Sequence, residues 1–198
     1  MSTGMNDIRS ISKGVSIFRR YKISYALLHC TSLYPTPYEK VRLGALNELR
    51  KSFPDAVIGL SDHTVDNYAC LGAVSLGASI LERHFTSSKK WTGPDIAVSM
   101  DPFDLKQLIN GSRAIFAASG GKKEILPEEK STIDFAYACV VAIKNIKKGE
   151  EFSKENIWVK RPGTGEIKAV NYKNVLGKTA TANIKKDQQI KFSHIRKA

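Results

Sequence analysis

The stretch IGLSDHT, residues 58–64, begins as an apolar run of the β type and ends in Ser61, Asp62, His63 and Thr64. A short apolar run of this kind is typical of a buried strand. Its polar end has two readings: either the strand simply reaches water there, or the strand end carries chemistry. The segments on either side of it help to decide between them.

Helical and strand patterns alternate on both sides of this stretch. Apolar residues recur at helical spacing in residues 6–21, 38–53, 67–77 and 101–118. Short apolar runs of the strand type lie at residues 23–30, 56–62 and 79–86. Asn6 is placed to cap the first helix. The alternation, with continuous apolar strands, predicts a parallel sheet covered by helices.

The composition changes to Gly, Lys, Glu and Pro at residues 119–132. Beyond this point the sequence shows short β runs broken by glycine and charged turns. We therefore predict a first domain at 1–120, a linker at 121–136 and a small β-rich domain at 137–198. Two similar turns, IKKGE (146–150) and IKKDQ (184–188), indicate either a weak internal symmetry or a chance recurrence.

The 198 residues, 42% of them hydrophobic, are enough for a packed core. Three scattered cysteines argue against a disulfide framework and for a reducing cytoplasm. The N-terminal residues lack the apolar core of a secretory signal, and the weakly polar run at 68–81 is too short for a membrane span. We expect a cytoplasmic protein that makes no membrane contact.

The net charge of +12 is concentrated in the C-terminal part of the chain. Residues 120–198 hold 17 Lys and Arg against 9 Asp and Glu, whereas residues 1–119 hold 14 against 10. This excess indicates either phosphorylated or carboxylated partners or a solvated lysine face. The sequence shows no basic run interleaved with aromatic residues, so a nucleic-acid partner is not predicted.

Side chains alternate along a strand, so residues two apart share a face. Ser61 shares a face with His63, Glu82 shares one with His84, and His29 lies near the end of the first strand. Three successive strands therefore each carry a histidine near the carboxyl end. Parallel α/β folds bind their ligands at this end.

Neighbouring strand ends can bring His63, His84 and Glu82 together with Asp95 from the segment TGPD. A mixture of histidine and carboxylate ligands without thiolates suits Mn²⁺ or Mg²⁺ better than a structural Zn²⁺. The sequence therefore contains a candidate divalent metal site.

The same residues also have structural readings. A histidine at a strand end is often held by a hydrogen bond and binds nothing else. Asp62 can cap the helix that follows it, and Glu82 beside Arg83 can form an ion pair at the rim. The spacing alone leaves both readings open.

Five motifs follow one another along the chain: HCTSLYPTP (29–37), GLSDHT (59–64), LERHFT (81–86), GPD (93–95) and KRPGTG (160–165). Together they closely resemble the N-acetylneuraminate synthase, or sialic acid synthase, family. The resemblance covers essentially the whole chain. It implies a (β/α)₈ TIM barrel followed by a small antifreeze-like domain of the SAF type, a β-clip. It also implies the condensation of phosphoenolpyruvate with N-acetylmannosamine and the release of phosphate.

The resemblance implies a metal site and two catalytic groups. His63 and His84 resemble metal ligands of the family, with Mn²⁺ as the expected ion and Mg²⁺ or Co²⁺ as alternatives. Glu82 and Asp95 resemble catalytic groups that face the sugar and the metal-bound water.

The resemblance also assigns substrate binding to six residues. Four resemble residues that hold the carboxylate and phosphate of phosphoenolpyruvate: Ser2, Ser32, Tyr34 and Ser61. Arg161 resembles an arginine of the antifreeze-like domain that contacts the sugar's N-acetyl group in the neighbouring subunit, and Phe135 is expected on the same rim. This role implies a domain-swapped homodimer.

A (β/α)₈ barrel needs about 250 residues, whereas the barrel-like part here ends near residue 120. The expected fold is therefore the C-terminal half of the barrel plus the antifreeze-like domain. Lysines that contact the phosphate in the family belong to the other half. We expect this chain alone to be catalytically incompetent, whether it is a truncated gene product, a half-enzyme completed by a second chain, or a fragment of a longer reading frame.

Two alternative functions remain open at this point. One is a sibling synthase that makes legionaminic or pseudaminic acid. The other is a non-catalytic assembly module built on the antifreeze-like domain. Metal dependence separates the enzyme from the module, because an enzyme half should bind Mn²⁺ through His63 and His84.

Overall fold

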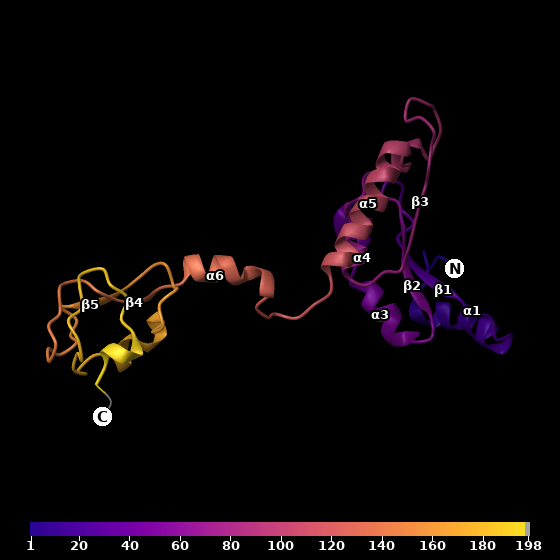
Figure 1. The fold of residues 1–198 in the computed structure, drawn as a ribbon. Coiled ribbons are helices and arrows are strands. Elements are labelled where there is room, and N and C mark those ends of the chain that lie inside the picture. Colours follow the sequence, from indigo (N-terminus) through magenta and orange to yellow (C-terminus); the bar gives the residue numbers. More distant parts are fainter. Residues whose placement is uncertain (197–198) are drawn as a thin grey trace. The chain divides into compact units, whose positions relative to one another are not determined.

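The computed structural model describes residues 1–196, which form two compact units (Figure 1). Unit 1 comprises Met1–Gly121, and unit 2 begins at Lys122. Each unit has a hydrophobic core of its own. The expected domain at 137–198 lies in unit 2, and its last two residues are outside the described residues. Among residues 1–196, no helix is both long enough and apolar enough to cross a bilayer.

Unit 1 alternates helices with strands, as predicted. Its elements are α1 (Ile8–Arg20), β1 (Ala26–Cys30), α2 (Tyr38–Val41), α3 (Ala45–Ser52), β2 (Val57–Asp62), α4 (Tyr68–Ser75), β3 (Ile80–Arg83), a 3₁₀ helix (Ile96–Val98) and α5 (Pro102–Ala118). The strands form a parallel sheet in the order β1–β2–β3. This sheet confirms the α/β class for the first part of the chain.

Two short segments extend the sheet at its edges. Ser2 pairs in parallel with Leu28 of β1, and Phe85 beyond β3 pairs in parallel with Met100. The chain therefore lines up five parallel segments, of which the inner three are regular strands. All of them run toward the same edge, where the polar strand ends gather.

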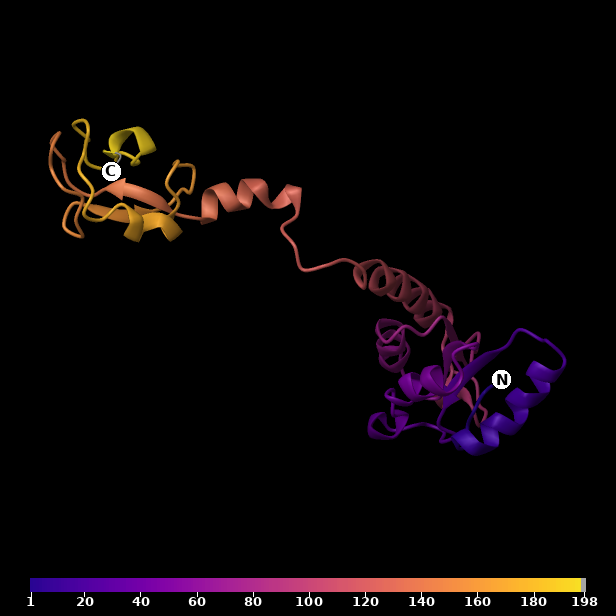
Figure 2. The ribbon, with the colours of Figure 1, turned by 90° about the horizontal axis from the view of Figure 1, so that it is seen from below.

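The two faces of the sheet differ in burial. Leu27, Ile58 and Leu60 point to the helices and are at most 4% exposed. On the other face, Val57 is 46% exposed and Ile80 is 39% exposed. Figure 2 shows the strands and helices of unit 1 from a second direction. We call the helix-covered face the outer face and the other the inner face, because the second would line the interior of a barrel.

The single helix predicted over 38–53 is wrong, since the structure divides it into α2 and α3. Arg42 between them adopts a left-handed backbone with φ of 53°. The carbonyl of Val41 accepts a hydrogen bond from the His29 ring at 2.7 Å instead of continuing the helix. Thr31 likewise donates to the carbonyl of Lys40 at 2.8 Å. Side chains from the end of β1 thus take the carbonyls that a continuous helix needs.

The predicted cap of the first helix is also wrong by one residue. Asp7, in an extended conformation, accepts a hydrogen bond from the backbone N–H of Ser10 at 2.7 Å. The Asn6 side chain instead donates to the carbonyl of Gly4 at 2.7 Å. The strand expected at 79–86 is shorter than predicted and ends at Arg83.

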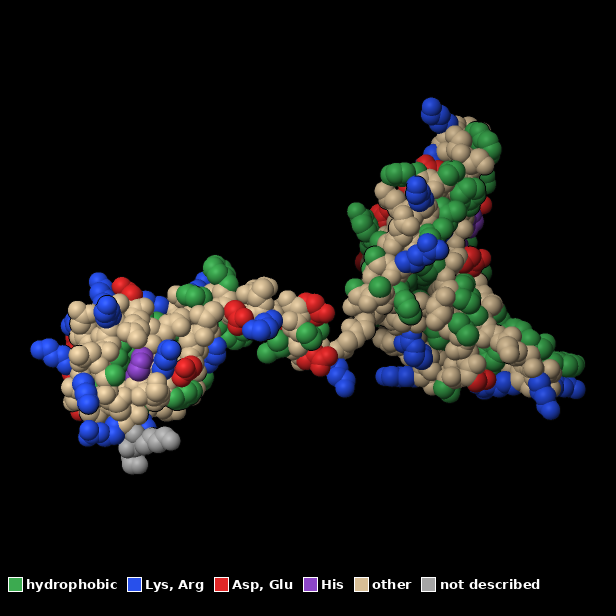
Figure 3. All heavy atoms as spheres, in the orientation of Figure 1, with side chains coloured by type: hydrophobic (Ala, Val, Ile, Leu, Met, Phe, Trp, Pro, Cys, Tyr) green, Lys and Arg blue, Asp and Glu red, His purple; other side chains and the backbone are tan. Residues whose placement is uncertain are grey.

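Unit 2 is small and built mainly from short β segments. β4 (Cys139–Ala142) and β5 (Ile157–Lys160) pair antiparallel, and isolated bridges attach the rest of the chain to them. The fully buried Phe152, Ile157 and Ile190 belong to its core. Lys and Arg side chains stand out over its surface in Figure 3. Three 3₁₀ helices lie at Pro127–Glu129, Ala169–Asn174 and Phe192–His194.

Part of the predicted linker is helical. Helix α6 (Lys130–Ala136) follows the 3₁₀ turn and belongs to unit 2. The backbone N–H of Gly163 donates to the carbonyl of Asp134 at 2.8 Å, which fixes the end of α6 beside the 161–163 turn.

The two lysine turns of unit 2 are related by symmetry in the structure. Ile146 donates to the carbonyl of Ile184, and Ile184 donates back to Ile146, each at 2.8 Å. The asparagine that opens each turn accepts from a backbone N–H of the opposite turn, at 2.8 and 2.9 Å. The similarity of residues 146–150 and 184–188 therefore reflects a real internal symmetry.

The close approach of β2 and β3 predicts a strict requirement for glycine at position 59. A Cβ atom there would lie 2.5 Å from the carbonyl oxygen of Ile80, so Gly59→Ala must push the two strands apart. We expect a loss of about 1–3 kcal/mol in the free energy of unfolding, measured by urea denaturation. Gly44→Ala is the control, because nothing lies within 4 Å of its added Cβ. Equal stability of the two variants would contradict this packing.

Candidate functional site

Two histidines face each other at the ends of β2 and β3, on the inner face. The ring centroids of His63 and His84 are 5.2 Å apart, and the ring planes meet at 71°. The Tyr34 ring, from the loop after β1, lies 4.1 Å from His63 and 5.7 Å from His84. Three aromatic side chains from three strand ends therefore form one cluster.

The tautomer of His63 follows from its hydrogen bond. His63 is 6% exposed, and its Nδ1 lies 3.1 Å from the carbonyl oxygen of Thr31. A carbonyl oxygen can only accept, so Nδ1 carries the hydrogen and donates it. In the neutral ring the lone pair then lies on Nε2, which is the form that binds metals. The thiol of Cys30 also lies 3.8 Å from Nδ1.

His84 has a carboxylate beside it. The Asp95 Oδ2 atom lies 3.6 Å from His84 Nδ1, and the Asp95 side chain is 55% exposed. Both residues line a cavity of about 390 Å³, to which the aromatic rings of Phe85 and Trp91 also contribute. This part of the site combines an imidazole, a carboxylate and apolar walls.

Ser61, Glu82 and Ser32 lie toward the same strand ends as this cluster, whereas Ser2 lies further back along the sheet. Ser61, 7% exposed, pairs in register with Glu82, so both side chains are on the inner face. Ser2 pairs with Leu28 at the neighbouring edge. Ser32 follows β1, with its hydroxyl 3.8 Å from the Cys30 sulfur.

The Tyr34 hydroxyl keeps its proton at neutral pH. Burial of the phenol, and then the nearby acidic groups of Cys30, Asp95 and Glu82, raise the pKa of Tyr34 above its usual range. The side chain is 52% exposed, so its hydroxyl can meet a ligand as a hydrogen-bond donor.

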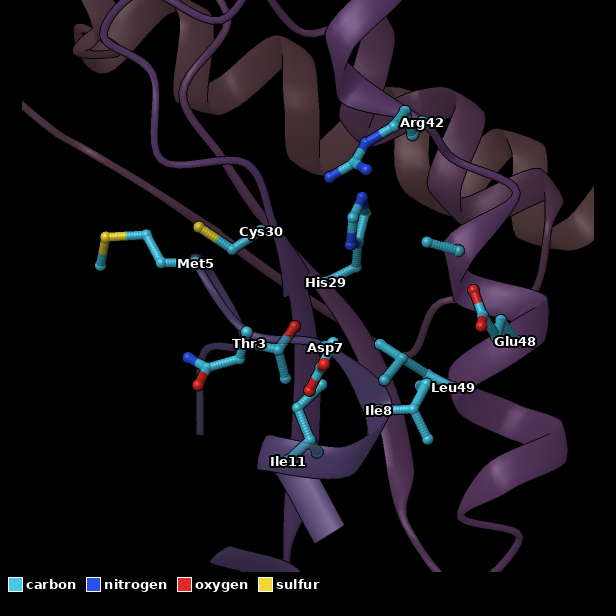
Figure 4. Close-up of a pocket in the computed structure, with 12 residues that line it drawn as sticks. Thr3, Met5, Asp7, Ile8, Ile11, His29, Cys30, Arg42, Glu48 and Leu49 are labelled. Atoms are coloured by element: carbon cyan, nitrogen blue, oxygen red, sulfur yellow. The ribbon is translucent and has the colours of Figure 1, made fainter. Parts of the chain in front are cut away.

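His29, the third strand-end histidine, lies on the outer face and takes no part in this cluster. Its Nε2 lies 2.7 Å from the carbonyl oxygen of Val41, and the residue is 6% exposed. It borders a separate cavity of about 430 Å³, where the Arg42 guanidinium points toward its ring (Figure 4). Burial, aided by the positive charge of Arg42, lowers the pKa of His29. The structural reading of a strand-end histidine therefore applies to His29.

The part of the chain that the structure describes does not enclose a metal site by itself. Among residues 1–196, no three His, Cys, Asp or Glu side chains converge closely enough to enclose a metal ion. What the structure brings together is the His63–His84 pair, with Asp95 next to His84. Two imidazoles and a nearby carboxylate can hold a cation that completes its coordination with water or substrate.

The two remaining predicted residues lie in unit 2. Phe135 on α6 is 71% exposed, and Arg161 is exposed directly after β5. The hydrogen bond between Gly163 and Asp134 brings their segments together. Unit 2 thus presents an aromatic ring and a guanidinium near the same turn.

The sequence reasoning missed a buried ion pair behind the histidines. Asp62 does not cap α4, which begins after Asn67, and Arg83 does not pair with Glu82. Instead Arg83 and Asp62 pair with each other, at 1% and 2% side-chain exposure. Strand alternation places both on the outer face, but the pairing depends on a register that the sequence does not give.

Comparison with known proteins identifies the family. Residues 1–124 match the NeuB family, and residues 137–196 match the SAF domain. The chain belongs to the NeuB family. Its architecture is part of the NeuB barrel, with a parallel sheet, followed by a small β-rich SAF domain.

Curated members of the NeuB family match nearly the whole chain. The N,N'-diacetyllegionaminic acid synthase of Campylobacter jejuni is 40% identical over 96% of this chain and 58% of its own length. Human N-acetylneuraminate-9-phosphate synthase is 32% identical over 96% of this chain and 53% of its own length. The chain thus spans a little over half the length of these relatives.

A solved structure agrees with this assignment. The spore coat polysaccharide biosynthesis protein SpsE of Bacillus subtilis superposes with a TM-score of 0.57 and 30% identity. The superposition covers 100% of this chain and 60% of that protein.

The lowered pKa of His29 predicts a loss of stability in mild acid. In the unfolded chain the His29 ring takes up a proton near pH 6.5, whereas the folded protein lowers the pKa of this ring. Neutral His29 therefore contributes its full stabilisation to the fold above pH 6.5, and this stabilisation is lost as the pH falls. We expect the free energy of unfolding, from urea titrations at pH 7.5 and 5.0, to fall less in His29→Gln than in the wild type. His194→Gln in unit 2 is the control. An unchanged pH dependence in His29→Gln would contradict the assignment.

Proposed function

We propose that this NeuB-family chain carries the metal- and acceptor-binding part of a synthase that condenses phosphoenolpyruvate with N-acetylmannosamine. The products are N-acetylneuraminate, a sialic acid, and phosphate. The facing pair His63 and His84 is the observation that carries the proposal. The pair lies at the carboxyl ends of parallel strands, the edge at which such folds bind their ligands.

The proposed cation is Mn²⁺, with Mg²⁺ or Co²⁺ as alternatives. His63 offers Nε2 because Nδ1 donates to Thr31, and His84 faces it across the inner face. Histidine and carboxylate donors without thiolate ligands suit these ions. A cation held there would act as a Lewis acid on the sugar aldehyde.

The other inner-face residues are suited to bind and orient the two substrates. Hydroxyl donors such as Ser61 and Tyr34 can hold the carboxylate and phosphate oxygens of phosphoenolpyruvate, and Ser2 and Ser32 are proposed to share this role. Because Tyr34 stays protonated, it can donate to an anion. Glu82 faces the acceptor from the same strand end.

The reaction forms one carbon–carbon bond and releases one phosphate. The enol carbon of phosphoenolpyruvate attacks the aldehyde carbon, and the aldehyde oxygen takes up a proton and becomes a hydroxyl. Water adds to the cationic carbon that bears the phosphate group, and loses its protons as the carbon–oxygen bond to phosphate breaks. Glu82 and Asp95, as carboxylates beside the site, are the proposed groups for these proton transfers.

Phe135 and Arg161 are proposed to act in a partner's site. The resemblance implies a domain-swapped homodimer, in which the guanidinium contacts the N-acetyl group of the acceptor. Both residues are exposed near one turn of unit 2, as this role requires. A separate chain that supplies the other part of the barrel is the second proposed partner.

A second acceptor is favoured by one observation. The chain is 40% identical to a synthase of diacetylated legionaminic acid and 32% identical to the human N-acetylneuraminate-9-phosphate synthase. The diacetylated amino-sugar precursor of legionaminic acid is therefore the alternative substrate to N-acetylmannosamine.

A reconstitution assay tests the proposal. The chain is incubated with Mn²⁺, phosphoenolpyruvate and each acceptor, alone and with a polypeptide carrying the part of the Campylobacter relative outside the matched region. We expect no turnover by the chain alone, and phosphate release with a sugar-acid product in the mixture. His63→Ala should slow the mixture by about 100-fold or more, whereas His194→Ala should not.

Two results would contradict the proposed function. Turnover by the chain alone above its His63→Ala variant would contradict the expected incompetence. Absence of product from every mixture, together with no Mn²⁺ binding that depends on His63, would contradict the synthase and support a non-catalytic module.

A further inference from the structure

A buried ion pair lies directly behind the two facing histidines. Asp62 and Arg83 are register partners at the ends of β2 and β3, and each precedes one of the histidines in the sequence. Because side chains alternate, the pair points to the outer face while His63 and His84 point to the inner face. Arg83 Nε lies 3.2 Å from Asp62 Oδ2, and the side chains are 1% and 2% exposed.

The guanidinium of Arg83 ties together segments that the sheet does not join. One terminal nitrogen donates to the Asn67 side chain at 2.8 Å. The other donates to the carbonyl of Thr64 at 2.6 Å and, more weakly, to that of Val98 at 3.4 Å. Arg83 therefore fixes the loop that leaves His63 against the strand that leads to His84. Its Nε contacts Asp62 as an ion pair without hydrogen-bond geometry.

Both oxygens of the Asp62 carboxylate accept hydrogen bonds within the protein. The carboxylate accepts from the backbone N–H of Thr64 at 3.1 Å and from the Thr64 hydroxyl at 2.8 Å. The thiol of Cys70 on α4 lies 3.7 Å from Oδ2. All of these partners lie on the helix side of the sheet. Asp62 and Arg83 therefore touch neither the inner face nor a ligand bound there.

The backbone on both sides of the histidines is held as well. The carbonyl of His63 accepts from the N–H of Thr36 at 2.9 Å, and the carbonyl of His84 accepts from the N–H of Met100 at 2.8 Å. These bonds anchor each histidine to a different neighbour. The Arg83–Asp62 pair is what joins one histidine-bearing strand end to the other on the outer face.

We propose that Arg83 and Asp62 are positioning residues that set the separation and orientation of His63 and His84 for binding one cation. The proposal rests on the proposed function, because the cation belongs to that site. A buried pair of charges is costly to desolvate and is often replaceable by apolar residues without loss of stability. We therefore explain the buried pair by the placement that it gives to the two imidazoles, and not by a gain in the free energy of unfolding.

The decisive variant removes both charges and retains the bulk: Asp62→Leu combined with Arg83→Met. Because no unpaired buried charge remains, the fold is expected to persist. Loss of groups that orient metal ligands weakens binding about 10–100-fold. We expect at least a tenfold increase in the Kd for Mn²⁺ in the whole chain, measured by electron paramagnetic resonance well below the thermal midpoint.

The matched control is the exposed pair of the same residue types. Arg19 and Asp55 form an ion pair at 50% and 44% side-chain exposure, away from the histidines. Asp55→Leu combined with Arg19→Met should leave the Kd for Mn²⁺ unchanged. If the buried double variant fails to fold, Arg83→Lys replaces it, since it keeps the charge and loses the forked geometry. The same tenfold weakening is then expected.

A second readout uses the metal-free protein. Two-dimensional ¹H–¹⁵N spectra of the imidazole rings report the tautomer of each histidine. In the wild type we expect His63 in the single Nδ1–H tautomer that the Thr31 carbonyl imposes. In the buried double variant we expect the averaged signals of both His63 tautomers. Unchanged ring signals together with an unchanged Kd would overturn the positioning role. Failure of the wild-type chain to bind Mn²⁺ would instead remove the proposed cation site.

Discussion

The register between β2 and β3 is the constraint on which the rest of the site depends. Asp62 pairs with Arg83 in this register, so the residues that follow, His63 and His84, leave the two strands on the same face. Gly59 permits the close approach of the strands, because a side chain there would strike the neighbouring backbone. A slip of one residue would send one imidazole to the helix side and abolish the pair.

The two faces of the sheet serve different purposes at the same strand ends. The outer face is packed against helices and holds the Arg83–Asp62 pair among hydrogen bonds that leave it no ligand-binding capacity. The inner face presents imidazoles, hydroxyls and carboxylates, and its apolar residues near the start of β2 and β3 remain partly exposed. In most parallel sheets both faces are covered, so the exposure of the inner face is unusual. The residues proposed to bind ligands and the residues that hold them in place therefore lie on opposite faces of the same sheet.

Much of this arrangement is readable from the sequence. The apolar strands, the helices between them, and the shared face of Ser61 and His63 follow from hydrophobic patterns with periods of two residues and about four residues. The family motifs then name the same residues. Local patterns suffice here because the strands are consecutive and parallel, so neighbours in sequence are neighbours in the sheet.

Other features depend on contacts that no local pattern encodes. The helix predicted over 38–53 breaks because His29, from β1, takes the carbonyl of Val41. The same contact removes His29 from the candidate site, although its position along its strand resembles that of the other histidines. The partner of Asp62 likewise comes from another strand. These errors concern side chains whose partners are distant in the sequence, whereas the misplaced cap of α1 is a local error, since Asp7 accepts from Ser10.

The proposed site requires His63 and His84 to hold one divalent cation together. Crystals of the chain grown with Mn²⁺, and measured at the manganese absorption edge, show directly whether they do. We expect one anomalous-difference peak between the two rings, within coordinating distance of a nitrogen of each. A peak at another place only, or no peak between the rings at a saturating concentration of Mn²⁺, would contradict this site.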